Sequence, residues 1–185
     1  MELKVGSKVF YPSHGAGKVK AQKEIEFNGE KKKYFEFELI TNPLSISTPV
    51  DNVEPLGIRE VLSAKKIAEE IKILKTSPSK NPKVTDFNIM LNMFKELEEK
   101  SDIKSTIEII QYCNFIKKGR EKEGRLIPTS IEKILEEPVR NIDGELALAS
   151  DKSLDEANLH FQKNKGIKVT LSEYYFLQII LHLQP

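Results

Sequence analysis

The stretch VFYPSHGAGKV, residues 9–19, decides how the first part of this chain folds. It starts as strand-like sequence, stops at Tyr11-Pro12 and resumes as strand-like sequence after Gly17. Pro12 donates no backbone N–H to a strand ladder and therefore ends the first strand. Gly15 and Gly17 permit positive φ and a close approach of two backbones. We interpret the stretch as a tight corner between two strands, with structural roles for Tyr11, Pro12, His14, Gly15 and Gly17.

Two other interpretations of this stretch fail on its chemistry. A phosphate-binding loop needs G-x-x-x-x-G-K-[ST] between a strand and a helix, but Val19 follows Gly17-Lys18 and the sequence continues as strand. A catalytic histidine needs a partner, and the chain has no G-x-S-x-G, H-E-x-x-H or C-x-x-C motif. We therefore predict no catalytic residue, no metal site and no cofactor, and we expect His14 to hydrogen-bond the backbone of the turn.

Residues 1–56 have the pattern of a small β module. Phe35, Phe37 and Leu39 alternate with polar residues, so that one face of their strand is apolar. Asn28-Gly29 favours a two-residue hairpin turn because both residues accept positive φ. Four or five short strands joined by tight turns predict a small Tudor/SH3-like β-barrel. The predicted strands are residues 8–11, 18–27, 32–40 and 44–50.

From residue 58 onward, apolar residues recur with the helical period of about 3.6. This pattern predicts an all-helical bundle behind the β module, which makes the fold class α+β. The predicted helices are residues 58–75, a second through 87–97, a third through 103–116 and a fourth from residue 129, and TSPSKNP at 76–82 is a loop.

The ends of these helices are predicted from their capping residues. Thr85 or Asp86 should cap the second helix, and Ser101 or Asp102 the third. Thr129 with Glu132, and Ser153 with Glu156, are two possible capping boxes. Pro138 should kink or end the fourth helix. GELALA at residues 144–149 then opens or continues a fifth, and Gly166 is a plausible stop for the last one.

Composition limits the class of protein. Of the 185 residues, 31% are charged and 39% hydrophobic, which is typical of a soluble globular chain. No apolar run reaches the ~18 to 20 residues that span a bilayer, and the N-terminus lacks the apolar core of a signal peptide, so we expect a cytoplasmic protein. The single cysteine, Cys113, is interpreted as a core residue. Residues 61–95 and 111–125 are locally basic, which permits modest phosphate binding although the net charge is only +1.

The motif V-x-Y-P-x-H-G-x-G-x-V, preceded by Val5-Gly6, resembles the start of the CarD/CdnL family of bacterial transcription regulators. A related segment occurs in the RNA-polymerase-binding domain of transcription-repair coupling factor. The resemblance extends over residues 1–150, and GELALA resembles the final helix of the family. Further matches at the family's spacings are Gly29, Tyr34, Pro49, Asn52, Gly57-Ile58-Arg59 and Val61.

The resemblance implies a regulator that is not an enzyme and whose N-terminal module binds the β subunit of RNA polymerase. An edge strand pairs with a polymerase strand, so that backbone hydrogen bonds supply contact and side chains supply selectivity. The family's arginines near this contact correspond to Ile25 and Ser47, and Lys20, Lys23 or residues 31–33 are possible substitutes. The matching edge strand consists of Leu44, Ser45, Ile46, Ser47 and Thr48.

The resemblance also implies contact with promoter DNA at the upstream edge of the transcription bubble, through a tryptophan wedge and basic residues. Wedges of this kind hold unstacked DNA. This chain has no tryptophan; the wedge position falls on Thr85, and Phe87 lies two residues later. Phe87 also fits the apolar stripe of its helix, and we interpret it as core in preference to a wedge. The candidate phosphate contacts are Lys80, Lys83, Lys117, Lys118, Arg120, Lys122 and Arg125.

Three functions follow as hypotheses. The first is a nucleoid-associated regulator that docks on RNA polymerase and modulates the stability of the open promoter complex without reading DNA sequence. The second is a DNA-binding architectural protein that acts without polymerase, and the third is a protein–protein adaptor without DNA activity. We expect a polymerase-interacting module at residues 1–56, a DNA-contacting helical domain at 57–150 and a helical extension at 151–185.

Overall fold

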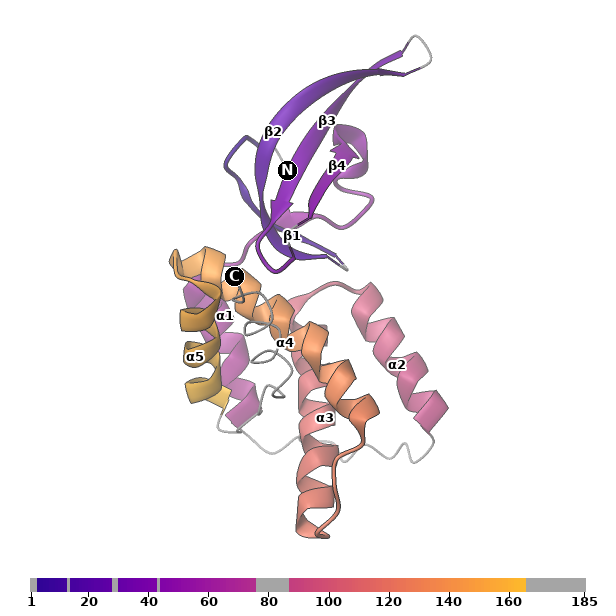
Figure 1. Cartoon of the computed structure of the whole chain (residues 1–185), viewed down its shortest axis with the longest axis vertical. Coiled ribbons are helices and arrows are strands. Elements are labelled where there is room, and N and C mark those ends of the chain that lie inside the picture. The colour runs from indigo at the N-terminus through magenta and orange to yellow at the C-terminus, as the bar shows by residue number, and fades with distance from the viewer. Residues whose placement is uncertain (1–2, 13, 28–29, 43, 76–86, 166–185) are drawn as a thin grey trace, which may run out of the picture.

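The computed structural model describes residues 3–12, 14–27, 30–42, 44–75 and 87–165 (Figure 1). In this part of the chain a five-stranded antiparallel sheet is followed by five α-helices, so the predicted α+β class is confirmed. The strands are β1 (Lys8–Tyr11), β2 (Gly15–Phe27), β3 (Glu30–Leu39), β4 (Ser45–Pro49) and β5 (Arg59–Glu60). The α-helices are α1 (Ala64–Ile71), α2 (Phe87–Glu99), α3 (Ile103–Lys122), α4 (Thr129–Ser150) and α5 (Leu154–Lys165).

The sheet has the strand order β4-β3-β2-β1-β5 and is open at both ends. Its own core contains Val9, Val19, Phe35 and Phe37, whose side chains occupy inward-facing positions of β1, β2 and β3. A closed Tudor-like barrel is not confirmed, because β4 and β5 are not paired with each other in the described residues. The module therefore presents strand edges whose backbone groups are open to a partner.

Strands β2 and β3 extend beyond the rest of the sheet. Strand β4 pairs with β3 only from Tyr34 to Glu38, whereas β2 and β3 continue to pair as far as Phe27 and Glu30. The outer part of this hairpin is a two-stranded arm that curves away from the helices (Figure 1). Opposite charges face each other across it, as in the pair of Glu24 and Lys33, and such cross-strand pairs support an exposed ribbon.

The first predicted helix starts later than its periodicity indicated. Residues 59–60 form β5 and pair with Phe10 and Val9 of β1, so α1 begins only at Ala64, where the Ser63 side chain accepts a hydrogen bond from the Lys66 N–H. Apolar residues at 58, 61 and 62 fit a helical period and a short strand equally well. Pairing with β1 decides in favour of the strand. A short 3₁₀ helix, Lys72–Lys75, follows α1.

The helices enclose one apolar cluster that is separate from the core of the sheet. It includes Ile67 of α1, Phe94 of α2, Ile110 of α3 and Ile142 of α4. The described part of the C-terminal extension belongs to it as well, because Phe161 of α5 is fully buried there. Asp102 caps α3 through a hydrogen bond from the Ser105 N–H, as predicted. The predicted caps Thr85 and Asp86, and the stop at Gly166, lie outside the described residues.

Helix α4 departs from two predictions. It runs without interruption from Thr129 to Ser150 with Pro138 inside it, so Pro138 does not end it and GELALA continues the same helix. The N-cap of the helix is Pro128, and no side chain caps it by a hydrogen bond. The predicted capping box of Thr129 and Glu132 is therefore wrong. The second predicted box is confirmed, because the Glu156 N–H donates to Ser153 Oγ and the Ser153 N–H donates to the Glu156 carboxylate.

The second half of α4 lies against the end of the sheet (Figure 1). A Cβ added to Gly144 would lie 2.6 Å from Thr41 Cγ2 and 3.3 Å from Ala16 Cβ. Only glycine permits this approach of the helix to β2 and to Thr41, just beyond the end of β3. The GELALA segment therefore forms the contact between the helices and the β module.

Candidate functional site

Strand β4 forms an open edge of the sheet and directs two of its residues outward. The Leu39 N–H donates to the Leu44 carbonyl at 3.2 Å. Hydrogen-bonded and non-hydrogen-bonded pairs alternate along an antiparallel ladder, so Ile46 and Thr48 use their backbone groups to bind β3. The backbone N–H and C=O of Ser45 and Ser47 therefore point away from the sheet. This edge can accept a further strand.

The side chains of β4 divide between the two faces of the sheet. Thr48 is 2% exposed, and Ile46 packs against the core of the sheet. Leu44, Ser45 and Ser47 are exposed. Of the predicted residues 44–48, these three present their side chains to solvent, whereas Ile46 and Thr48 hold the strand in place.

The predicted position Ile25 lies on the same face as Ser47. It pairs with Lys32 in the arm beyond the end of β4, and its side chain is 40% exposed. Between Ile25 and Ser47, the same face carries Glu36 with Lys23 ion-paired to it. The pKa of Glu36 is lowered, chiefly by its hydrogen bond with Lys23. A lysine thus occupies the face on which the resemblance places arginines.

The other candidate lysines differ in their partners. Lys20 Nζ lies 3.5 Å from a carboxylate oxygen of Glu38, and Lys32 Nζ lies 3.4 Å from one of Glu30. Each of these pairs is exposed, so the lysine exchanges its partner at little cost in free energy. These side chains are available to an acidic surface that approaches β4.

The corner at residues 11–17 is connected to β4. The Tyr11 hydroxyl lies 3.3 Å from Thr48 Oγ1 in the interior of the sheet module. His14 Nδ1 donates to the Pro12 carbonyl at 3.0 Å, and its ring packs edge-on against that of Tyr11. Gly15 has φ +92°, and a Cβ there would lie 2.6 Å from Thr41 Oγ1. The residues of the turn thus contact one another, and Tyr11 also contacts the buried face of β4.

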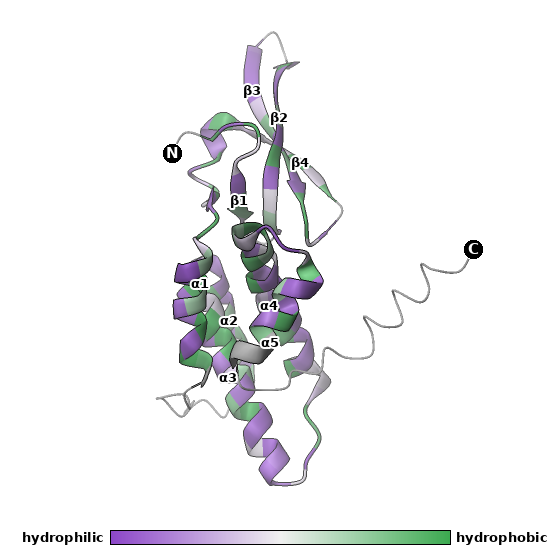
Figure 2. Ribbon diagram, turned by 90° about the vertical axis from the view of Figure 1, so that its left-hand side faces the viewer, coloured by the Kyte–Doolittle hydropathy of each residue, from purple (hydrophilic) through white to green (hydrophobic). Residues whose placement is uncertain are grey.

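The second candidate surface is the end of α3, which projects beyond the other helices (Figures 1 and 2). Helix α2 has 13 residues and α3 has 20, and a short turn joins them. At 1.5 Å per residue the seven extra residues extend α3 by about 10 Å. The buried stripe of α3, which passes through Ile110 and Cys113, meets Lys117 and Arg120 at the next helical spacings. The stripe of α3 is therefore charged at its end, whereas its earlier positions are mostly apolar.

This end of α3, together with the turn that follows it, is called the basic tip below. It gathers Lys117, Lys118, Arg120, Lys122 and Arg125, with Glu121 and Glu123 as its acids. Lys118, Lys122 and Arg125 are exposed, while Lys117 and Arg120 are partly buried. The predicted basic cluster is thus brought together on one projecting element, and it suits contact with phosphates.

Leu126, at the end of the basic tip, was missed by the sequence analysis. Its side chain is 91% exposed, yet its backbone is held, because Arg120 Nη1 donates to the Leu126 carbonyl at 3.3 Å. The Arg125 N–H also donates to the Arg120 carbonyl at 2.9 Å, and Gly124 supplies φ +65°. In the sequence, the signal that could have indicated this exposed residue is a leucine between Gly124 and Pro128 that fits no apolar periodicity.

Phe87 is the first residue of α2 and is 44% exposed, so its interpretation as a core residue is wrong. Met90, three residues later, takes the buried position instead. Because α2 and α3 form an antiparallel hairpin, Phe87 lies at the same end of the helical domain as the basic tip. The remaining candidates Lys80, Lys83 and Thr85 lie outside the described residues.

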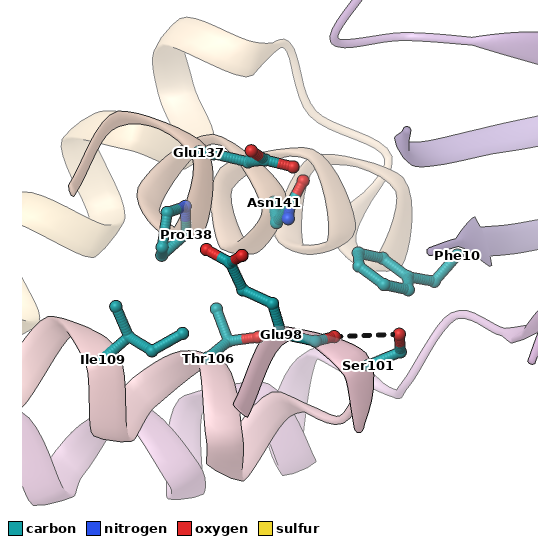
Figure 3. A pocket seen from close by; sticks show the side chains of 8 residues that line it. All are labelled: Phe10, Glu98, Ser101, Thr106, Ile109, Glu137, Pro138 and Asn141. Atoms are coloured by element: carbon teal, nitrogen blue, oxygen red, sulfur yellow. Dashed lines mark hydrogen bonds between the residues drawn. The ribbon is translucent and has the colours of Figure 1, made fainter. Parts of the chain in front are cut away.

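A hollow of about 60 Å³ lies where β1 meets the helices (Figure 3). Its lining includes Phe10 of β1, Glu98 of α2, and Glu137 and Asn141 of α4. Burial, and next the charge of Glu137, raise the pKa of Glu98. This volume is far below the ~300 Å³ of a typical small-molecule site. A wider, open hollow of about 400 Å³ lies beside β4 and is lined by Leu39, Leu44 and Ser45 among others.

The described ranges bear on three other kinds of site: a metal centre, a membrane span and a nucleophilic thiol. They contain no group of three or more His, Cys, Asp or Glu side chains arranged to hold a metal ion. Within the same ranges, no helix is both long and apolar enough to traverse a bilayer. Cys113 is buried, and burial raises the pKa of its thiol to about 12, so it is not a nucleophile at neutral pH.

The described residues form a β module with an open sheet edge, joined to a helical domain. Residues 3–62 match the model of the CarD-like/TRCF RID domain family. The sheet module is therefore a CarD-like/TRCF RID domain, and the resemblance found in the sequence is confirmed over this region. Domains of this family are regulatory and interact with RNA polymerase.

Proposed function

We propose that this protein is a transcription regulator that docks on the β subunit of RNA polymerase through β4 and contacts promoter DNA through the basic tip. The main observation in favour of docking is that the backbone N–H and C=O groups of Ser45 and Ser47 point outward at an open sheet edge. This edge belongs to a domain that matches a polymerase-interacting family. A polymerase strand added there gains main-chain hydrogen bonds. Lys20 and Lys23, on the face beside this edge, meet acidic groups of the polymerase.

The DNA contact is supported by the shape and charge of the basic tip. Lys118, Lys122 and Arg125 are exposed on an element that projects beyond the apolar core. Such residues bind phosphates without reading sequence. Leu126 and Phe87 are exposed apolar side chains at the same end of the domain, and apolar side chains of this kind insert between base steps. Docking on polymerase raises the local concentration of DNA, so weak contacts suffice.

The docking step is tested with an isolated polymerase β lobe and two variants of one residue. Ser47→Pro removes the outward N–H, whereas Ser47→Ala keeps this N–H and removes only the hydroxyl. We expect Ser47→Ala to bind within a few-fold of the parent protein and Ser47→Pro to lose about tenfold or more in affinity, since one backbone hydrogen bond and the local fit of the strand are lost. Circular dichroism and thermal unfolding establish that both variants are folded.

Equal affinity of the proline variant and the parent protein would contradict docking through β4. Absence of binding by the folded parent protein would contradict polymerase docking itself.

The DNA step is tested on open promoter complexes formed with polymerase. Lys118→Ala, Lys122→Ala and Arg125→Ala should each weaken the effect of the protein on the lifetime of the complex. Each should also lower the salt dependence of DNA binding by about one unit of slope. Lys104→Ala is the matched control, because Lys104 is an exposed lysine at the opposite end of α3. Polymerase binding without any effect of the tip variants would favour the adaptor function, which the absence of tryptophan supports.

A further inference from the structure

One buried carboxylate connects the sheet module to the helical domain. Glu145 Oε1 accepts a hydrogen bond from Arg59 Nη1 at 2.5 Å, and Glu145 Oε2 accepts one from Arg59 Nη2 at 3.0 Å. Glu145 Oε1 also accepts the Leu62 N–H at 2.9 Å. Arg59 belongs to β5, Leu62 to the segment between β5 and α1, and Glu145 to α4. Three donors from the end of the sheet module therefore hold one side chain of the longest described helix.

The surroundings of this contact make its geometry specific. Glu145 is 2% exposed, so its charge needs partners. The guanidinium carbon of Arg59 lies 4.5 Å from the centroid of the Phe10 ring, and Phe10 also lines the hollow at the junction (Figure 3). A bidentate arginine–carboxylate pair fixes the relative orientation of two planar groups. The Phe10 ring next to the guanidinium restricts its position further.

The residue before Glu145 restricts the distance between the same two elements. Gly144 brings α4 so close to Thr41 and Ala16 that a Cβ would not fit without movement. Gly144 therefore sets how near the helix lies, and the Arg59–Glu145 pair sets its direction. The exposed pair Lys8–Asp151, at 2.6 Å, also bridges the two parts, but solvent screening leaves such a pair little directional effect.

A buried ion pair is by itself weak evidence of stabilisation. Well-packed apolar residues of similar volume are often equally stabilising or more so, whereas hydrogen-bonded charges restrict geometry. We propose that Arg59 and Glu145 are positioning residues that fix the angle between the β4 edge and the basic tip. The functional consequence of this inference rests on the proposed function. The rigidity of the joint between the sheet module and the helical domain, however, is measurable in the free chain.

The consequence for function follows from preorganisation. The β4 edge and the basic tip belong to different parts of the molecule, and both must meet partners in one complex. If the joint is rigid, docking at β4 places the basic tip at one position relative to DNA without a further loss of orientational freedom. A loose joint spreads the tip over many positions and lowers its effective concentration at the DNA.

The test replaces the ion pair by an apolar contact in the variant Arg59→Met/Glu145→Leu. This change removes both charges together, so no unpaired charge stays buried. Lys8→Ala is the matched control, since it removes the exposed bridge between the same two parts. The angle is measured as a spin-label distance distribution between Glu54→Cys and Glu108→Cys, which replace exposed residues of the sheet module and of α3. Cys113 is buried and does not take the label.

The proposal expects a broader distance distribution in the double variant and an unchanged one in Lys8→Ala, both with intact circular dichroism spectra. The double variant should bind the β lobe with an affinity within twofold of that of the parent protein. Its effect on the lifetime of the open complex should be about tenfold smaller. A second variant, Glu145→Gln, keeps an oxygen that accepts the Leu62 N–H but replaces the bidentate ion pair by a single neutral acceptor, so it should broaden the distribution less than the double variant does.

Two results overturn the proposal: a narrow distribution in the folded double variant, or a broad one that leaves the effect on open-complex lifetime unchanged. If the parent protein does not bind the β lobe, the proposed function fails. The distance distribution then decides the rigidity of the joint by itself.

Discussion

The hydroxyl of Tyr11 lies 3.3 Å from Oγ1 of Thr48, so the corner after β1 contacts the inner face of the strand proposed to bind polymerase. Both groups are buried, and a buried hydroxyl that loses its partner carries a desolvation cost. The aromatic ring of Tyr11 also packs edge-on against Phe37 in the centre of the sheet core. Tyr11, which belongs to the motif that resembles the family, therefore supports β4, the edge strand proposed to bind polymerase.

The pair of Tyr11 and Thr48 is expected to contribute to stability as a unit. Tyr11→Phe and Thr48→Val should each lower the free energy of unfolding by about 1 kcal/mol, and the double variant should lose less than the sum. Urea denaturation of the four proteins measures the coupling energy. Strictly additive losses would show that the two hydroxyls do not interact.

Gly144→Ala is expected to destabilise the protein although alanine favours helices. Helix propensity alone would add about 1 kcal/mol of stability. The new Cβ would lie 2.6 Å from Thr41 Cγ2, however, and overpacking of this kind costs about 1–3 kcal/mol. The double variant Gly144→Ala/Thr41→Ser, which removes that methyl group, should recover part of the loss.

Gly119→Ala is the matched control on α3, because the added Cβ meets no atom within 4 Å apart from the adjacent backbone of its own helix. This variant should gain about 0.5–1 kcal/mol. Thermal unfolding of both glycine variants provides the comparison. A gain at both positions would contradict the close approach of α4 to the sheet.

Glu98 should make stability depend on pH with a definite sign. Burial, and next Glu137, raise the pKa of Glu98 above its ordinary value of 4.5, while Lys95 lowers it. Between pH 4.5 and the raised pKa, the folded protein binds more protons than the unfolded chain. The free energy of unfolding contributed by this group is therefore highest below pH 4.5 and falls as the pH rises through the folded pKa.

Glu98→Gln should remove this dependence, so the variant should gain stability relative to the parent protein at neutral pH and lose that advantage in acid. The midpoints of urea denaturation of the variant and of the parent protein, measured across the pH range, test this difference in stability. Glu137→Gln should reduce the dependence without removing it, since burial is the larger cause. A difference between Glu98→Gln and the parent protein that is independent of pH would contradict the expectation.

Cys113 is expected to report unfolding. The thiol is buried and its pKa is raised to about 12, so very little thiolate forms at neutral pH. A thiol reagent should react with the native protein only as fast as the helical domain opens, and with the protein in urea at the rate of a free thiol. Rapid labelling of the native protein would show that α3 opens locally.

The sequence by itself determined those features that depend on neighbouring residues. The corner at Tyr11-Pro12, the hairpin strands, α2 and α3 with its Asp102 cap, and the box of Ser153 and Glu156 all follow from alternation, periodicity or local hydrogen bonds. The family motif is also local, since it occupies one short stretch and a few turns. The gathering of the basic residues on the end of α3 follows from their helical spacing.

Only the tertiary structure decided the features that depend on distant partners. Residues 59–60 became a strand because β1 lies beside them, and α4 continued through Pro138 while both of its halves packed on other elements. Phe87 is exposed although Met90, three residues later in the same stripe, is buried. Arg59 and Glu145 are 86 residues apart, and no local pattern indicates such a pair. Contacts of this range form only when the sheet and the helices pack, so only the tertiary structure shows how β4 and the basic tip lie relative to each other.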